Sequence, residues 1–238
     1  MAKKGNSSVL KRLNSPGFLR LHRKKYKFST KPRAGPHSAR NSFTLTYVLR
    51  DLLGFASNAK EVKRILHGGK VLVDGKVRKD PHFPVGLMDV IELPDLKQTH
   101  RIVPDKLYNM KPVEITKDKT SKLCKILGKH TLKGDKCQLN LHDGRNVIVD
   151  EGSKYNVNDV VQIDLKKNEI KDSVSFEEGK IAIVSAGINN GRMGKITGFT
   201  KIRKNDMVTL DDQGEKFDTA LHYVFVLGDS KPIIQMPV

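Results

Sequence analysis

The chain has 238 residues, enough for about one to two domains, and its 44 Lys and Arg residues against 26 Asp and Glu residues give a formal charge of +18. Its apolar runs are interrupted by charges and fall short of the ~20 residues of a membrane-spanning helix, and its first residues lack the apolar core of a secretory signal. We therefore expect a cytoplasmic protein without a membrane segment, and two cysteines, Cys124 and Cys137, are too few for the disulfide framework of a small secreted domain.

Positive charge is concentrated in the first 42 residues, which carry twelve Lys and Arg residues and no carboxylate. Self-repulsion and several Gly and Pro residues predict an arm that is largely disordered when free. Each basic residue adds to the affinity for a nucleic acid by neutralising a phosphate, and each acidic residue reduces that affinity. This composition therefore favours a nucleic-acid-binding arm over a solvated loop or a targeting peptide. The arm residues that we expect to contact nucleic acid are Lys11, Arg12, Arg23, Lys24, Lys25, Arg33, His37 and Arg40.

Two short amphipathic helices are predicted after the arm. Apolar residues recur at spacings of three and four between Leu45 and Leu53, which predicts a helix over residues 42–53 that Gly54 ends. Asn58 can cap a second helix, with Glu61 three residues later completing a capping box, and residues 68–69 (Gly-Gly) end it. The polar side of this second helix is predicted to form a compact basic face close to Lys70.

A β-hairpin is predicted next, because Asp74-Gly75 tolerates the positive φ angles of a tight turn. A strict two-residue turn would place Leu72 opposite Val77 and leave Val71 and Val73 on the charged side. We therefore expect a bulge or a longer turn, and the register stays open. A third strand is expected over residues 89–93.

Residues 58–75 (NAKEVKRILHGGKVLVDG), followed by residues 79–81 (KDP) and 86–91 (GLMDVI), resemble the alpha-L RNA-binding motif. That motif occurs in a bacterial small-subunit ribosomal protein, in some pseudouridine synthases and in tyrosyl-tRNA synthetase, and its basic helix side and hairpin grip structured RNA. For any single side chain, an ordinary solvated helix face remains an equal alternative. The resemblance implies RNA contacts from Lys60, Lys63, Arg64, His67, Lys70, Lys76 and Arg78.

From residue 105 onward short apolar runs alternate with turn residues, which predicts two small barrel-like β domains. The second begins near Phe176, and its residues 179–199 (GKIAIVSAGINNGRMGKITGF) resemble the KOW motif, which is carried on an SH3-like barrel. The alternative is that these glycines serve only as turn residues. The resemblance implies contacts to RNA or protein from Arg192 and Lys195.

The sequence shows no catalytic constellation with a recognisable local context. Cys124, His130, Cys137 and His142 lack the close cysteine spacing of a zinc knuckle, and no GxxxxGK[ST] loop is present. We therefore expect no enzyme activity, no cofactor, no metal and no small-molecule substrate. An RNA-modifying enzyme would need a large α/β catalytic domain, for which residues 105–238 leave no room, and an elongation factor with a KOW barrel would not be expected to carry the helix-hairpin unit.

Further short segments extend the resemblance: residues 10–16 (LKRLNSP), 83–91 (FPVGLMDVI), 155–159 (YNVND) and 225–228 (FVLG). Together with both motifs, they identify the chain as a member of the archaeal and eukaryotic type of small-subunit ribosomal protein four. This resemblance implies a structural protein of the cytoplasmic small ribosomal subunit, monomeric outside the ribosome, whose partners are ribosomal RNA and neighbouring ribosomal proteins. Eukaryotic members usually carry a further basic tail, so an ending at Met236-Pro237-Val238 favours an archaeal origin.

The family implies an α+β fold with four segments. These are a basic RNA-binding arm (1–42), an alpha-L domain with its helix pair and hairpin (43–104), a central β domain (105–173) and a KOW/SH3-like β domain (174–238).

Overall fold

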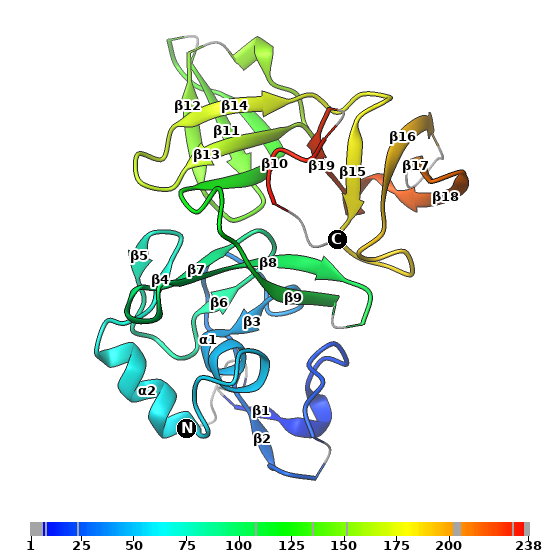
Figure 1. Ribbon diagram of the computed structural model, residues 1–238. Helices are drawn as coiled ribbons and strands as arrows, with labels where there is room; N and C mark the ends of the chain where they lie inside the picture. The colour runs from blue at the N-terminus through cyan, green and yellow to red at the C-terminus, as the bar shows by residue number, and fades with distance from the viewer. Residues whose placement is uncertain are drawn as a thin grey trace, which may run out of the picture.

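The computed structural model has an α+β architecture in which three five-stranded antiparallel sheets hold most of the regular structure of the described residues. Figure 1 shows the arm and the first sheet in the lower half of the molecule, with the other two sheets side by side above them. No helix in the described part of the chain is long and apolar enough to cross a membrane. Arg23 and residues 236–238 lie outside the described residues, which are 7, 9–22, 24–107, 109–134, 136–150, 152–201, 206–229 and 231–235.

The described part of the arm is folded against the body of the protein. Strand β1 (Leu10–Lys11) pairs with β2 (Phe28–Ser29), and a 3-10 turn, η1 (Arg12–Asn14), follows β1. Leu19 is only 7% exposed and belongs to the same core cluster as Phe43. The prediction of a largely disordered arm is therefore wrong for these residues, because apolar side chains in the arm are buried despite its charge.

The first predicted helix is shorter and less regular than its apolar spacing indicates. Residues Phe43–Thr44 form strand β3, which pairs with β6 (Pro84–Val85). A helical segment follows as α1 (Leu45–Tyr47) and a π-helical turn, η2 (Val48–Leu52). The predicted start at residue 42 is thus too early, and the cap is Thr44, whose hydroxyl accepts a hydrogen bond from the Tyr47 N–H at 3.3 Å.

The second helix, α2 (Ala59–His67), confirms its prediction from the capping residues. The Asn58 carbonyl oxygen Oδ1 accepts from the Glu61 N–H at 3.0 Å, and the Glu61 carboxylate accepts from the Ser57 N–H at 2.7 Å. Val62 and Leu66 on its inner side are fully buried. The helix is therefore stabilised by two hydrogen bonds at its N-terminus and by one buried apolar stripe.

The hairpin after α2 has a two-residue turn, so the expected bulge is wrong. Leu72 pairs with Val77, and Asp74 and Gly75 adopt φ angles of 51° and 72°. Val73 is 2% exposed, whereas Val77 on the other face is 50% exposed. The face that carries Val71 and Val73 is therefore the buried face of the hairpin. Lys76, which lies on the same face, is in the edge strand and reaches solvent there.

The first sheet has the strand order β5-β4-β7-β8-β9. The paired residues of β8 and β9 run from His100 and Glu114 to Asp105 and Asn109, so this sheet continues across the expected division between residues 104 and 105. Its strands are β4 (Leu72–Val73), β5 (Lys76–Val77), β7 (Val90–Leu93), β8 (Gln98–Asp105) and β9 (Asn109–Glu114), with a 3-10 turn, η3 (Pro94–Leu96), between β7 and β8.

The central sheet has the order β12-β11-β10-β13-β14. Its longest strand is bent by a register shift between Ile126 and Gly128, which lets one half pair with β11 and the other with β13. Its strands are β10 (Ser121–Thr131), β11 (Cys137–Leu141), β12 (Asn146–Val149), β13 (Val160–Asp164) and β14 (Ile170–Val174), and a 3-10 turn, η4 (Gly152–Lys154), follows β12.

The third sheet has the order β18-β17-β16-β15-β19. Its core includes Leu123 and Val160 from the central sheet and Met88 from the first unit, so the units pack through a common core. Its strands are β15 (Ile181–Val184), β16 (Met193–Thr200), β17 (Met207–Asp212), β18 (Glu215–Ala220) and β19 (Val224–Gly228), and a 3-10 turn, η5 (Leu221–Tyr223), precedes β19.

Candidate nucleic-acid interface

The outer side of α2 is a basic surface. Lys60, Lys63, Arg64 and His67 are all exposed, on the side opposite the buried Val62. None of these four side chains forms an ion pair with a described residue, because the carboxylates near them engage other groups. The positive charge that the sequence predicts on this helix is therefore available to an external anion.

Next to this surface, a hollow of about 450 Å³ lies between α2 and the segment of residues 79–82. The arm reaches it through Arg33, whose N–H donates to the His82 carbonyl at 3.0 Å and whose guanidinium is 3.2 Å from the Asp80 carboxylate. The side chain of Arg33 is 71% exposed. The hollow is lined by Arg33, Lys63, His67, Lys79, Asp80, Pro81 and His82.

This hollow unites residues that are far apart in the sequence. Arg33 comes from the arm and Lys63 from α2, and both were predicted, whereas Lys79 and His82 were not. The sequence signal for Lys79 was present, since it stands in the KDP segment of the alpha-L resemblance. A concave surface with five basic side chains and one carboxylate is suited to hold a phosphate.

The basic residues of the hairpin differ in their availability. Lys76 is exposed, and Lys70 lies 2.9 Å from Asp95 in a pair whose two side chains are 56% and 59% exposed. Arg78 is half-buried, with its guanidinium 4.4 Å from the centre of the Phe83 ring. An exposed ion pair is weak, so the side chains of Lys70 and Lys76 are both free to contact an external anion. The guanidinium of Arg78 is instead held in place against the Phe83 ring.

In the arm, Lys11, Lys24, Lys25 and Arg40 are exposed. Arg12 is half-buried, and its guanidinium donates to the backbone carbonyls of Leu21 and His22 rather than to a carboxylate. Carbonyl acceptors leave the positive charge of Arg12 uncompensated. The described arm residues therefore present an excess of positive charge to the outside.

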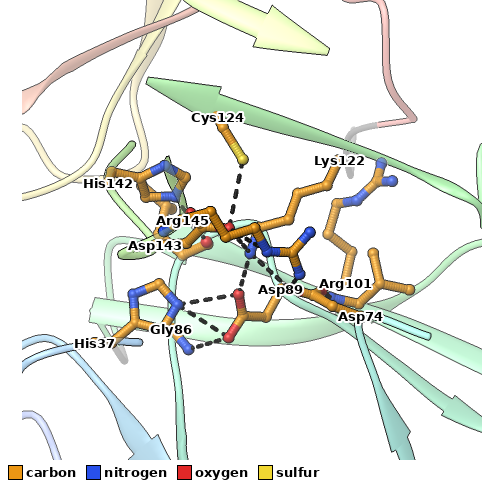
Figure 2. A network of polar contacts seen from close by, with 12 residues as sticks. His37, Asp74, Gly86, Asp89, Arg101, Lys122, Cys124, His142, Asp143 and Arg145 are labelled. Carbon is orange, nitrogen blue, oxygen red and sulfur yellow. Dashed lines mark hydrogen bonds and ion pairs between the residues drawn. The ribbon is translucent and has the colours of Figure 1, made fainter. Parts of the chain in front are cut away.

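His37 is the predicted contact residue that the structure places in the interior, where its side chain is 6% exposed. Its Nε2 lies 3.0 Å from both carboxylate oxygens of Asp89, as Figure 2 shows. A side-chain Cβ at Gly86 would collide with the His37 ring, so the ring fits only against a glycine. His37 thus attaches the arm to the body, and its prediction as an RNA contact is corrected.

Asp89 belongs to a buried network centred on the ammonium of Lys122, whose side chain is fully buried (Figure 2). The Lys122 Nζ lies 2.8 Å from Asp74, 2.5 Å from Asp89 and 3.1 Å from Asp143. Arg145 adds a second cation, 2.7 Å from Asp74 and 3.2 Å from Asp143. The network therefore joins the hairpin turn and β7 side of the first sheet to β10 and the β11–β12 turn of the central sheet.

The protonation of this network follows from burial and from its opposite charges. Burial opposes the charged form of Lys122, but Asp89 and Asp74 hold its pKa well above the ordinary lysine value. Burial likewise opposes ionisation of Asp89, but Lys122 and His37 lower its pKa below the ordinary range. Burial dominates at Asp74 and raises its pKa. The favoured state is thus a charged lysine between carboxylates of unequal acidity.

The side chains weighed as a zinc set lie in ordinary structural surroundings. Cys124 and Cys137 are free and buried, and burial raises the pKa of the Cys124 thiol well above its usual value. His142 accepts from the Lys125 N–H at 3.2 Å, and burial followed by the charge of Lys122 lowers its pKa to about 4. The other ring nitrogen, Nε2, lies 3.2 Å from the Leu87 carbonyl, so a neutral imidazole that accepts at Nδ1 and donates at Nε2 satisfies both contacts.

The two basic residues of the KOW-like stretch differ. Arg192 is 2.7 Å from Glu215 and 3.4 Å from Asp212, so its charge is compensated within the sheet, whereas Lys195 is exposed. The adjoining loop is anchored to the first sheet, where the Asn190 side-chain amide donates to the carbonyls of Asp105 and Asn109 at 2.8 Å each.

Known proteins are similar to this chain over nearly its full length. Three family models match: "RS4NT (NUC023) domain" over residues 4–40, "S4 domain" over residues 47–91 and "Ribosomal family S4e" over residues 96–170. The small ribosomal subunit protein eS4 of Methanococcus aeolicus is 45% identical over 99% of this chain and 100% of that protein. The protein of the same description from Methanocaldococcus jannaschii is 42% identical over the same shares.

A solved structure is also similar. The crystal structure of the 30S ribosomal protein S4e from Thermoplasma acidophilum matches with a TM-score of 0.70 and 31% sequence identity, over 80% of this chain and 96% of that chain.

Proposed function

The chain belongs to the ribosomal family S4e, a non-enzymatic constituent of the small ribosomal subunit, and we propose that it binds ribosomal RNA through the surface that the arm and α2 build together. The observation that carries this proposal is the hollow lined by Arg33, Lys63, His67 and Lys79. Phosphate contacts of this kind fix the position of a protein on RNA and supply most of its affinity.

The proposed contact residues are those that offer charge to the outside. We leave out His37, because it is buried against Asp89, and we assign Arg192 a minor part, because Glu215 and Asp212 already engage it. Lys79 and His82 are added, since they line the hollow. Arg23, which lies outside the described residues, is kept on its sequence alone. The remaining set is Lys11, Arg12, Lys24, Lys25, Arg33, Arg40, Lys60, Lys63, Arg64, His67, Lys70, Lys76, Arg78 and Lys195.

The arrangement of segments is part of the proposal. The first comprises the arm of residues 1–42, and the second an alpha-L unit that extends to the end of β9, because β8 and β9 pair in one sheet. The central and C-terminal sheets are two small barrel-like β domains, the latter an SH3-like barrel with a KOW motif. Each of these two sheets has a long central strand, β10 or β16, with a register shift along it. Such a shift bends a strand, and this supports sheets that curve toward a barrel.

The partners that this function implies are small-subunit ribosomal RNA and neighbouring ribosomal proteins. The protein acts in the cytoplasm as a monomer before assembly, takes no small-molecule substrate, and is of archaeal origin. The identity of 42–45% to two archaeal proteins over nearly the full chain supports the last point.

Binding of the full chain to purified small-subunit ribosomal RNA across a salt series tests the proposal. We expect log K to fall linearly with log salt, with a slope of about 0.7–0.9 for each phosphate neutralised. Co-sedimentation with small subunits should accompany this binding. A protein that neither binds this RNA nor sediments with the subunit would contradict the proposal.

A further inference from the structure

The arm carries two aromatic side chains that the body does not cover. Tyr26 and Phe28 are each 51% exposed, although both are large apolar residues. Phe28 lies in β2 opposite Lys11, and the Lys27 carbonyl accepts the Arg12 N–H at 3.0 Å, so the backbone that carries the rings is held by β1. The rings are thus presented by an ordered segment.

At least one cation lies close to each ring. The Lys25 ammonium is 5.6 Å from the Tyr26 ring centre, and the Lys27 ammonium is 5.7 Å from that of Phe28. The Arg50 guanidinium, from the helical segment after α1, is 5.7 Å from the Tyr26 ring. These distances are close to the outer limit of about 6 Å for cation–π contact, so the lysine head groups can leave the rings at small cost.

A narrow depression beside the rings contains a single carboxylate. It is lined by Tyr26, Phe28, Arg12, Lys25, Arg50 and Asp51 among others. Arg50 engages Asp51 at 2.7 Å, so the carboxylate stays at this place. At about 20 Å³ the depression is too small for a nucleobase or a phosphate, so a base would lie on the half-exposed ring faces beside it.

We propose that Tyr26 and Phe28 form a stacking platform for unpaired nucleobases of the bound RNA, with Lys25 and Lys27 moving to the flanking phosphates. This inference rests on the proposed RNA-binding function and assigns a different kind of contact to a part of the arm away from the α2 hollow. Aromatic rings beside mobile cations are the usual means of holding single-stranded RNA, because every base has a π-face.

The test uses the full chain and a single-stranded oligouridylate that carries one 2-aminopurine, whose fluorescence falls when it stacks on an aromatic ring. We expect the wild-type protein to quench the fluorescence of this probe and to leave that of the matching duplex unchanged. Replacing both rings (Tyr26→Leu with Phe28→Leu) should abolish the quenching and weaken binding of the single strand roughly 5- to 140-fold for each base that can no longer stack.

Three control variants separate stacking from other effects. Tyr26→Phe keeps the ring and should retain the quenching, and Leu13→Ala removes an aliphatic side chain that is 80% exposed in the same arm and should also retain it. Lys25→Ala with Lys27→Ala should lower the salt dependence of binding but leave the quenching at saturation. Far-UV circular dichroism of each variant verifies that the arm replacements leave the fold intact.

The outcomes distinguish this inference from the proposed function. If the double leucine variant binds and quenches like wild type, the platform is wrong even though the protein binds ribosomal RNA. If that variant keeps RNA binding but fails to enter small subunits, the rings contact a protein, which also overturns the inference. If the wild-type chain binds no RNA at all, the proposed function itself is wrong.

Discussion

The ammonium of Lys122 in the central sheet lies 2.8 Å from the carboxylate of Asp74, which forms the hairpin turn of the first sheet. Asp74 therefore has two roles, since its φ angle of 51° shapes the turn and its side chain joins two sheets. The contact joins the hairpin of the first sheet to the central sheet through a buried cation.

Replacing this cation (Lys122→Met) is expected to destabilise the protein by about 3–5 kcal/mol, because three carboxylates would be left without their central partner in the interior. Urea denaturation of the variant and the wild type measures the difference. Lys171→Met, which removes an exposed partner of Asp164, is the matched control and should change stability little. Equal losses of stability in the two variants would show that the buried network is not special.

Stability is expected to fall between pH 6.5 and about 4 because of His142. Its folded pKa of about 4 lies below the ordinary value of 6.5, so the unfolded chain binds a proton first and gains about 1.4 kcal/mol per pH unit over this window. The lowered pKa of Asp89 acts in the same direction but only below its unfolded value of about 4.

His142→Gln removes this titratable group, and the slope of unfolding free energy against pH should become shallower across the window. Denaturation at several pH values provides the measurement. His130→Gln replaces an exposed imidazole and serves as the control. An unchanged slope in His142→Gln would show that His142 is protonated as easily in the folded protein as in the unfolded chain.

Charge reversal on α2 (Lys63→Glu with Arg64→Glu) is expected to weaken ribosomal RNA binding and to reduce its salt slope by about 0.7–0.9 for each phosphate that is no longer neutralised. Both side chains are exposed on the outer side of the helix, so the fold should persist. Lys166→Glu with Lys167→Glu changes the net charge equally at an exposed turn of the central sheet. If both double variants bind with equally reduced affinity, only total charge matters and the α2 surface is not a specific site.

Asn190→Ala is expected to cost about 1–3 kcal/mol, because the two hydrogen bonds that its amide donates to carbonyls of the β8–β9 hairpin are lost. Thermal unfolding compares it with Asn189→Ala, whose amide donates to a single exposed carbonyl, that of Asp218, at 3.2 Å. Asn189→Ala should have the smaller effect. The reverse order would contradict the anchoring role of Asn190.

Local signals in the sequence predicted the elements that depend on neighbouring residues. The Asn58–Glu61 spacing located α2, and Asp74-Gly75 located the hairpin turn. The two-residue turn of the hairpin was not predicted, because it places Val71 and Val73 on the same face as basic residues. The tertiary structure shows that these basic residues belong to the edge of the sheet, where they reach solvent. The arm was misjudged since its charge was weighed and its short apolar run around Leu19 was not.

The buried network could not be predicted in the same way. Lys122 is separated from Asp74 by 48 residues and from Asp89 by 33, so no local spacing connects them. A weak signal was present, because Asp89 interrupts an apolar run and Lys122 directly precedes Leu123 and Cys124. Isolated charges of this kind are usually solvent-exposed, and only the tertiary structure shows that they meet.

The separation of these partners in the sequence has a consequence for synthesis. Asp74 and Asp89 leave the ribosomal exit tunnel 48 and 33 residues ahead of Lys122. In a nascent chain that ends before β10, both carboxylates lack their lysine partner, so the contact between the hairpin turn and the central sheet cannot form. The N-terminal half therefore reaches its mature form only after the central sheet has been translated.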